Sequence, residues 1–312
     1  MSPTVSVVLP VYNGERYLRA SIDSVLTQSL QDFEFIIWDD ASTDSSREII
    51  SSYSDPRIRV FENNSNLGLF KTLNLIITNS SGPLIKLWSQ DDVMKEDCLS
   101  KLTSFLSTQK KAAMAYCAYD LFDRDGKVYK PAPPDQTPET IDPRLAAQIM
   151  FYNGSLTGNI ANVILRRSAL DEVGLFREDM MVSGDFEMWV RLSERWPTGF
   201  LNESLLLLRS HEEQFSRRKG IYVQFMKEDR EIVDTLLRRL PLELRSHARR
   251  YEVCQRQVLY FHYLLRCLLS GNWSTASQTY REIAKQSRFG LVALIWLLTA
   301  NHRLYRIRPK YA

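Results

Sequence analysis

The chain has 312 residues, of which 44% are hydrophobic and 25% charged, and its formal net charge is +3. This is the composition of an ordinary globular protein of one large or two modest domains, and it excludes a chain too polar to form a core. The charge is uneven, because residues 220–312 hold 16 Lys and Arg against 7 Asp and Glu, whereas residues 1–100 hold 8 against 14. The basic C-terminal third is either a solvated helical face or a surface for a partner of negative charge.

The first part of the chain alternates between strand and helix patterns. Apolar, β-branched runs predict strands at 5–11, 33–40, 57–64 and 83–92. Helical spacing of apolar residues predicts helices between them, at 15–29, 42–54 and 68–82. The order βαβαβαβ predicts a doubly wound α/β sheet.

The remainder divides into a loop-rich middle and a helical end. Residues 130–143 carry five prolines and predict an irregular connection, and 151–159 also has the composition of a loop. From about residue 220 the pattern changes to long amphipathic helices without strands. We therefore expect an α/β domain at 1–219 and a helical region at 220–312.

The cysteines and the start of the chain indicate the compartment. The four cysteines have no metal-type spacing and are typical of reduced, structural residues in a cytoplasmic protein. The first residues, MSPTVSVVLPVYN, lead into a strand and lack the basic start and apolar core of a signal peptide. The longest apolar run, FGLVALIWLLTA at 289–300, is shorter than the ~20 residues that span a bilayer. We expect a cytoplasmic protein.

Two of the predicted strands end in adjacent aspartates, Asp39 with Asp40 and Asp91 with Asp92. Ligands of a doubly wound sheet bind at the carboxyl ends of its strands, where both pairs would lie. The chain has neither G-x-G-x-x-G nor a Walker loop to hold phosphates. A divalent cation on Asp91 and Asp92 would supply the positive charge that a bound diphosphate needs. The alternative is that each pair caps a helix.

Five segments together resemble glycosyltransferases of family 2, which have the GT-A fold. They are VSVVLPVYNGERYLRASIDSVLTQSLQDFEFIIWDDASTD, NNSNLGLFKTLN, SQDDV, LRRSALDEVGLF and SGDFEMWVRL, in the order of the family and within about residues 4–215. The resemblance implies a Rossmann-like α/β fold with a mixed, mainly parallel sheet and flanking helices, followed by a mainly helical C-terminal region. It also implies that residues 1–219 are the catalytic domain.

The resemblance gives each matching residue a role. The residues that would bind the nucleotide sugar are Pro10, Val11, Tyr12, Glu15, Asp40, Asn66, Gly68, Gln90, Asp91 and Arg209. Asp40 would contact the base, with Asp39 beside it, and Asp91 would contact the ribose. Asp92 would hold a divalent metal, Mg²⁺ or Mn²⁺. His211 would be a second metal ligand or, as often for a lone His, a structural residue. Arg209, His211 and Ser216 would close over the diphosphate.

The last role is that of the catalytic base, which falls to Asp185; the alternative is that Asp185 caps the helix that follows it. Two residues depart from the family pattern. Gln90 stands where the family has the first carboxylate of its metal motif, so metal binding would depend on Asp92, His211 and the substrate phosphates. Gly184 stands where the family has an acidic neighbour of the base, so Asp185 would be a lone carboxylate, ionised at neutral pH as a base must be.

These roles imply an inverting transfer, in which Asp185 takes a proton from an acceptor hydroxyl and a metal neutralises the departing nucleoside diphosphate. The resemblance suggests bacterial surface polysaccharide synthesis, of the O-antigen or capsule type, with a glycan or lipid-linked acceptor. One alternative is a non-catalytic scaffold or sugar-nucleotide-binding protein on the same fold. Another is a nucleotidyltransferase, for which LPVYNGERY is a poor phosphate loop. We expect no nucleic acid partner, because the chain lacks a recognised module.

The end of the chain has the pattern of a membrane-surface helix. One face of the apolar run carries Leu291, Leu294, Ile295 and Leu298. The tail that follows carries Arg303, Arg306, Arg308 and Lys310, with no acid after Glu282. Trp296 and Tyr305 would lie at the level of the lipid headgroups. We therefore expect peripheral contact with the inner face of an anionic membrane; the alternative is that the helix packs on the catalytic domain.

Overall fold

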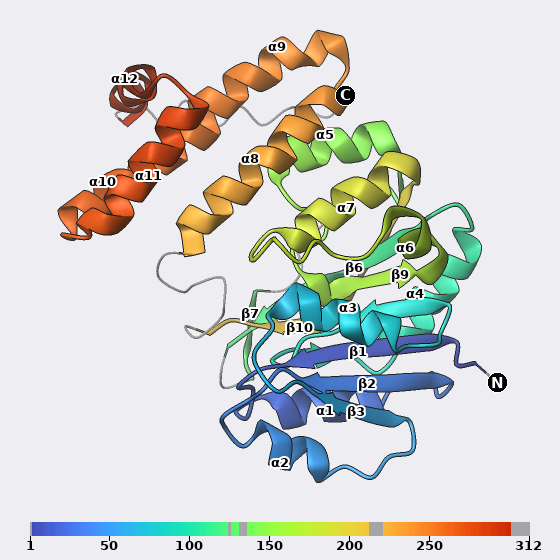
Figure 1. Cartoon of the computed structure of the whole chain (residues 1–312). Helices are drawn as coiled ribbons and strands as arrows, with labels where there is room; N and C mark the ends of the chain where they lie inside the picture. The colour runs from blue at the N-terminus through green and yellow to red at the C-terminus, as the bar shows by residue number, and fades with distance from the viewer. Residues whose placement is uncertain (1, 124–125, 131–135, 212–220, 301–312) are drawn as a thin grey trace. The chain divides into compact units, whose positions relative to one another are not determined.

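A computed structural model describes residues 2–123, 126–130, 136–211 and 221–300. The chain divides into two compact units. Unit 1 comprises residues 1–146 and 155–214, and unit 2 comprises residues 147–154 and 215–312. Each unit has a hydrophobic core of its own, and most of the helices and strands of both are labelled in Figure 1.

Unit 1 is built on a mixed sheet, which has ten strands among the described residues (Figure 1). Their order is β3-β2-β1-β4-β9-β6-β10-β5, with β7 beside β6 and β8 beside β10. β3, β2, β1 and β4 are parallel neighbours, and so are β6 and β10, whereas β5, β7, β8 and β9 pair antiparallel. This arrangement confirms the expected mixed sheet with flanking helices.

The strands of unit 1 are β1 Val5–Val11, β2 Phe33–Asp39, β3 Ile58–Glu62, β4 Leu84–Leu87, β5 Val93–Met94, β6 Met114–Phe122, β7 Val128–Lys130, β8 Thr140–Ile141, β9 Val163–Arg166 and β10 Thr198–Arg209. Its helices are α1 Leu18–Leu26, α2 Ser46–Ser51, α3 Leu69–Thr78, α4 Cys98–Thr108, α6 Arg167–Val173 and α7 Gly184–Arg195, with a short 3-10 turn, η1, at Ile160–Asn162. The seven elements predicted for residues 5–92 are all present; β1 has the predicted bounds, and the other six are shorter than predicted.

The parallel half of the sheet is apolar because both of its faces are covered. Every residue of β2 is buried. On one face Val7 and Leu9 of β1 share a core with Leu18, Ile22 and Val25 of α1, and all five side chains are fully buried. The carboxyl ends of β1, β2 and β4 are therefore held in place by a closely packed core.

Three sequence expectations differ from the structure. β4 ends at Leu87, so residues 88–92 form a turn rather than the end of a strand. The proline-rich stretch contains the short strand β8. Helix α5, Pro143–Asn153, extends into the stretch at 151–159 that was expected to be a loop. Pro143 suits the first position of a helix, and the buried Met150 and Phe151 hold the last turn by packing.

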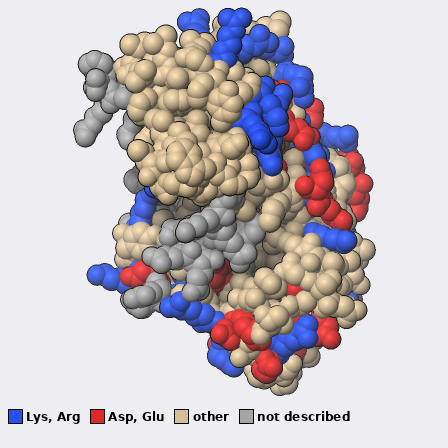
Figure 2. Space-filling model, turned by 60° about the vertical axis from the view of Figure 1, so that its left-hand side comes forward, with Lys and Arg blue, Asp and Glu red and all other residues tan. Residues whose placement is uncertain are grey.

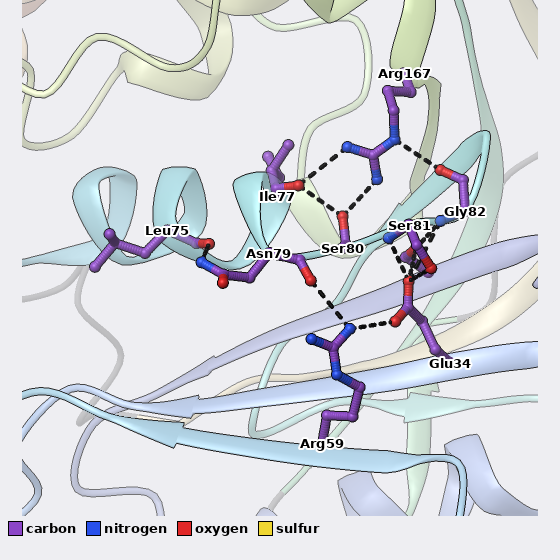
Figure 3. Close-up of polar contacts among 10 residues, drawn as sticks. Glu34, Arg59, Leu75, Ile77, Asn79, Ser80, Ser81, Gly82 and Arg167 are labelled. Carbon is purple, nitrogen blue, oxygen red and sulfur yellow. Dashed lines mark hydrogen bonds and ion pairs between the residues drawn. The ribbon is translucent and has the colours of Figure 1, made fainter. Parts of the chain in front are cut away.

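The amino ends of the strands are joined by a buried carboxylate (Figure 3). Glu34 of β2 accepts hydrogen bonds from the hydroxyl of Ser6 at 2.7 Å and from the backbone N–H of Ser81 at 2.5 Å. It also pairs with the guanidinium of Arg59 at 2.7 Å. Burial raises the pKa of Glu34, but the hydrogen bonds from Ser6, Ser81 and Arg59 outweigh it and lower the pKa to about 2. The neighbouring Arg167 donates to the carbonyls of Ile77 and Gly82 (Figure 3).

Unit 2 is helical throughout its described residues, as expected for the region after 220. Beyond the end of α5, its helices are α8 Ile221–Arg239, α9 Leu242–Tyr251, the π-helix η3 Glu252–Gln257, α10 Val258–Leu269, α11 Trp273–Gln286 and α12 Phe289–Ala300. Inside it, the buried carboxylate of Asp229 accepts from Arg256 at 2.8 Å and from the hydroxyl of Tyr260 at 2.7 Å. None of the helices in the described part of the chain is long and apolar enough to cross a membrane.

Candidate active site

The first aspartate pair lies at the carboxyl end of β2, beside the end of β1. Asp39 pairs with Val11 in the parallel ladder, and the N–H of Asp40 donates to the carbonyl of Val11 at 2.7 Å. Pro10 precedes Val11 and lies opposite Trp38. The structure thus brings Pro10, Val11 and the first aspartate pair together, as a nucleotide pocket at this edge requires.

Asp40 is buried and holds the turn before α3. Its carboxylate accepts from the side-chain amide of Asn63 at 2.7 Å and from the backbone N–H groups of Leu67 at 2.8 Å and Gly68 at 2.9 Å. Gly68 has a φ of +89°, in the region that favours glycine. The exposed Asn66 lies in the same turn. Asp40 therefore holds the turn that leads into α3, and its contact with a base stays a prediction.

Asp39 is also engaged within the protein. Its Oδ2 accepts from the N–H of Ser42 at 3.0 Å and from the guanidinium of Arg47 at 2.9 Å. Its Oδ1 is buried and has no hydrogen-bond partner among the described residues. Glu15 reaches the same region, since its carboxylate accepts from the N–H of Ser45, just before α2, at 2.9 Å. The backbone N–H groups that Asp39 and Asp40 bond lie in the turns before α2 and α3 rather than in those helices, so neither residue is a helix cap.

Gln90 joins the turn after β4 to the loop after β1. Its side-chain carbonyl accepts from the N–H of Tyr12 at 2.9 Å, and its amide donates to the carbonyl of Tyr12 at 3.1 Å. An ionised carboxylate could make only the first of these bonds. Gly14 leaves room for this side chain, because a Cβ there would lie 2.7 Å from Gln90 Oε1 and would force the amide to shift. This contact explains why an amide stands in place of the acidic residue.

The second aspartate pair forms a cluster with the end of β10. His211 Nε2 lies 2.9 Å from Asp91 Oδ2, and the N–H of Arg209 donates to Asp92 Oδ1 at 2.8 Å. The hydroxyl of Ser89 also donates to Asp91. Burial opposes ionisation of Asp91, but the hydrogen bonds from His211 and Ser89 outweigh it and lower its pKa. Burial, and then the charge of Asp91, raise the pKa of Asp92 well above its usual range.

Arg209 holds this cluster in place. Its guanidinium lies between two rings, 4.2 Å from the centroid of Tyr17 and 4.1 Å from that of Phe122. Its Nε donates to the carbonyl of Asp91 at 3.0 Å. Only 7% of Arg209 is exposed, so it positions the aspartates, and closure over a diphosphate stays a prediction. Sequence reasoning missed Tyr17 and Phe122, because nothing in their local pattern distinguishes them from core aromatics.

The donor atoms at this cluster fit a divalent cation. Carboxylate oxygens and imidazole are ligands that Mg²⁺ or Mn²⁺ accepts, and such ions commonly use one or two carboxylates together with substrate phosphates. His211 Nδ1 is buried without a partner among the described residues. Within the same residues, no group of three or more His, Cys, Asp or Glu is arranged to hold a metal. A cation here would therefore need Asp92, His211 and the phosphates of a donor.

Asp185 lies in the first turn of α7. Ser183 stands at the N-cap position of this helix, but its side chain makes no capping bond, whereas the carboxylate of Asp185 accepts from the N–H of Phe186 at 2.7 Å; the role of Asp185 as a base stays a prediction. A Cβ on Gly184 would lie 2.7 Å from the ring of Phe70, in the first turn of α3. The close approach of Gly184 to Phe70 explains why glycine replaces an acidic neighbour. Ser216 lies outside the described residues.

Comparison with known proteins gives matches in family, sequence and fold. The model of the family described as glycosyl transferase family 2 matches residues 6–174. An uncharacterized glycosyltransferase of Rickettsia prowazekii is 29% identical over 216 residues, 68% of this chain and 66% of that protein. The putative teichuronic acid biosynthesis glycosyltransferase TuaG of Bacillus subtilis is 28% identical over 221 residues, 70% of this chain and 83% of that protein. A match with a glycosyltransferase of Rickettsia felis covers 36% of that protein. The chain therefore spans less than two thirds of the length of the two Rickettsia proteins.

Two solved structures share the fold. TarS of S. aureus in complex with UDP-GlcNAc has a TM-score of 0.61 at 16% identity, covering 93% of each chain. The mannosyltransferase PcManGT of Pyrobaculum calidifontis, in complex with GDP-Man and Mn²⁺, has a TM-score of 0.58 at 13% identity, covering 96% of this chain and 80% of that one. At these identities the likeness is one of fold alone.

Proposed function

Because the chain belongs to glycosyltransferase family 2, we propose that it is an inverting glycosyltransferase that moves a sugar from a nucleoside-diphosphate sugar to an acceptor hydroxyl. The observation that carries the proposal is the cluster of Asp91, Asp92 and His211 at the carboxyl edge of the parallel strands. A solved relative in fold holds GDP-Man with Mn²⁺, which supports a divalent metal beside the donor.

Each part of the cluster has a task in this reaction. Asp91 contacts the ribose of the donor, while Arg209 holds Asp91 and Asp92 in position through its hydrogen bonds to both residues. A divalent cation on Asp92 and His211 would neutralise charge on the leaving diphosphate. Asp185 takes the proton of the acceptor hydroxyl, which attacks the anomeric carbon on the face opposite the leaving group and inverts it.

The name of one relative supports a role in surface polysaccharide synthesis, since TuaG is named for teichuronic acid biosynthesis. We place the reaction in the cytoplasm, with a glycan or lipid-linked hydroxyl as acceptor. A lipid-linked acceptor would reach the site from the inner face of the membrane.

The test is a panel of UDP-, GDP- and dTDP-sugars with the purified chain. We expect one donor class to raise the thermal unfolding temperature in the presence of Mg²⁺ or Mn²⁺, and the chain to release the nucleoside diphosphate from that donor. Binding without release for every donor and acceptor would favour the non-catalytic alternative. A panel with neither binding nor release would contradict the proposal.

A further inference from the structure

Helix α12 uses one side to complete the core of unit 2. Val292 is fully buried, and Ala293 packs against the same cluster. The ring of Trp296 lies 5.6 Å from that of Phe261, a residue of this core. Trp296 thus packs inward, rather than lying at the level of lipid headgroups as its sequence position suggested.

The opposite side of α12 carries four exposed leucines. They are Leu291, Leu294, Leu297 and Leu298, with exposed fractions of 46%, 52%, 62% and 65%. Their spacing of three and four residues places them along one stripe of the helix. A helix that is apolar on all sides is normally buried on all sides. The described residues leave these four leucines, the leucine stripe, exposed, so we expect another apolar surface to cover them.

The surroundings of the leucine stripe identify what covers it. No residue of α12 is charged. In Figure 2, the upper half of the face in view has a broad area free of charged side chains, with Lys and Arg along its upper border and both basic and acidic side chains along its right-hand border. The sequence after α12 adds Arg303, Arg306, Arg308 and Lys310 and no acid. An apolar stripe beside basic residues matches the interface of a membrane that contains anionic lipid.

We propose that the leucine stripe of α12 inserts into the interfacial region of an anionic membrane leaflet, with the helix lying along the surface. The twelve residues of α12 are too short to cross a bilayer, which needs ~20. A second copy of the chain is the alternative occupant of the leucine stripe, and the experiment below distinguishes it from a membrane. The proposal goes beyond the glycosyl transfer proposed above and does not depend on it.

The test is co-sedimentation of the full chain with vesicles, either of phosphatidylcholine alone or of an equal mixture with phosphatidylglycerol. We expect binding to the mixed vesicles at low salt, and weaker binding at moderate salt as the charges are screened. The double variant Leu294→Gln/Leu298→Gln should lower the partition onto mixed vesicles by about tenfold or more, because two apolar side chains no longer enter the lipid.

The matched control is Leu242→Gln/Leu259→Gln, which changes two leucines that are 77% and 61% exposed on α9 and α10. Leu242 is followed by Glu243, and Leu259 shares its helix face with Arg266, so neither belongs to the leucine stripe. Both double variants should keep the unfolding temperature of the native chain. The control should bind vesicles like the native chain.

Three results would overturn the proposal. The first is a native chain that stays in the supernatant with both kinds of vesicle. The second is equal vesicle binding by the stripe variant and the control. The third is a dimer at micromolar concentration that the stripe variant alone loses, which would assign the leucine stripe to a second copy. None of these measurements needs a sugar nucleotide, so failure here leaves the proposed transfer untouched.

Discussion

Asp91 and Asp92 lie next to each other, and among the described residues only Asp91 has a basic side chain within hydrogen-bond distance of its carboxylate. The imidazole of His211 is 2.9 Å from Asp91, while Asp92 is 3% exposed and receives the backbone N–H of Arg209. Two adjacent carboxylates repel, and burial adds to the cost of ionising the second. The residue that gains most from a bound cation is therefore Asp92.

The first prediction is that Asp92→Asn lowers glycosyl transfer by orders of magnitude, because the charge that would hold the cation is lost. The unfolding temperature should stay the same or rise, since an amide oxygen still accepts from Arg209 and the repulsion from Asp91 is removed. Turnover and thermal unfolding measure the two effects. The control Asp171→Asn changes an exposed carboxylate on α6 and should alter neither. Full turnover of Asp92→Asn in chelator-treated buffer would contradict the metal assignment.

The second prediction concerns Asp185 as the base. Asp185→Asn should lower turnover by ~10²–10⁴-fold and leave donor affinity nearly unchanged, because this residue is assigned to the acceptor. Glu187→Gln is the matched control, since Glu187 is also in the first turn of α7 and pairs with Arg191 at 2.7 Å. If donor affinity fell as far as turnover, or if both variants behaved alike, the role of Asp185 would be structural.

At the scale of elements, single polar side chains join strands that are distant in sequence. Gln90 joins the turn after β4 to the loop after β1, and Asp40 joins the end of β2 to the start of α3. At the amino ends of the same strands, Glu34 of β2 joins Ser6 of β1 to Arg59 of β3. The site edge and the opposite edge of the parallel half are thus both held by buried hydrogen bonds.

The third prediction is that Glu34→Gln lowers the free energy of unfolding by about 2–3 kcal/mol at neutral pH. The pKa of Glu34 is about 2 in the folded protein and 4.5 in an unperturbed carboxyl group. Its contribution is therefore complete above pH 4.5 and is lost as the pH falls through about 2. The difference between native and variant, measured by urea unfolding across this range, should shrink on acidification.

A control for this prediction is Glu62→Gln on β3, where the carboxylate is 67% exposed and lies 3.9 Å from Arg47. Exposed ion pairs contribute little, so the variant should unfold like the native protein within about 0.5 kcal/mol. A loss at Glu34→Gln that stayed constant down to pH 2 would show that packing, rather than ionisation, is the source of the stability.

At the scale of the molecule, the two units divide the tasks. The described residues assigned to donor, metal and base all belong to unit 1. Unit 2 has a separate core and carries the leucine stripe. The charge follows the same division, because the surplus of Lys and Arg lies after residue 220. We infer that damage to the core of unit 2 leaves donor binding intact.

The fourth prediction tests this inference with Leu264→Ala, which removes a buried side chain from α10. The cavity should cost about 2–5 kcal/mol of unfolding free energy. Calorimetry should show the loss in the transition of unit 2, while the affinity for the donor found in the panel stays unchanged. Leu259→Ala, on the exposed side of the same helix, should change neither quantity. Loss of donor affinity in the Leu264 variant alone would contradict the division of tasks.

The sequence by itself determined the elements of the parallel half, because a strand covered on both faces must be apolar and the helices between must show their period locally. It also determined the family, since the motifs are short runs of adjacent residues. The tertiary structure decided what each carboxylate does, because the partners are distant along the chain. Asp40 accepts a hydrogen bond from the N–H of Leu67, 27 residues away, and Asp92 accepts one from the N–H of Arg209, 117 residues away. Equally, only packing could show that Gly184 leaves room for Phe70, and that the leucines of α12 face outward while Trp296 faces the core. The local sequence pattern indicates which helix or strand a residue belongs to. Its burial and its hydrogen-bond partners depend on which helices and strands pack together in the fold.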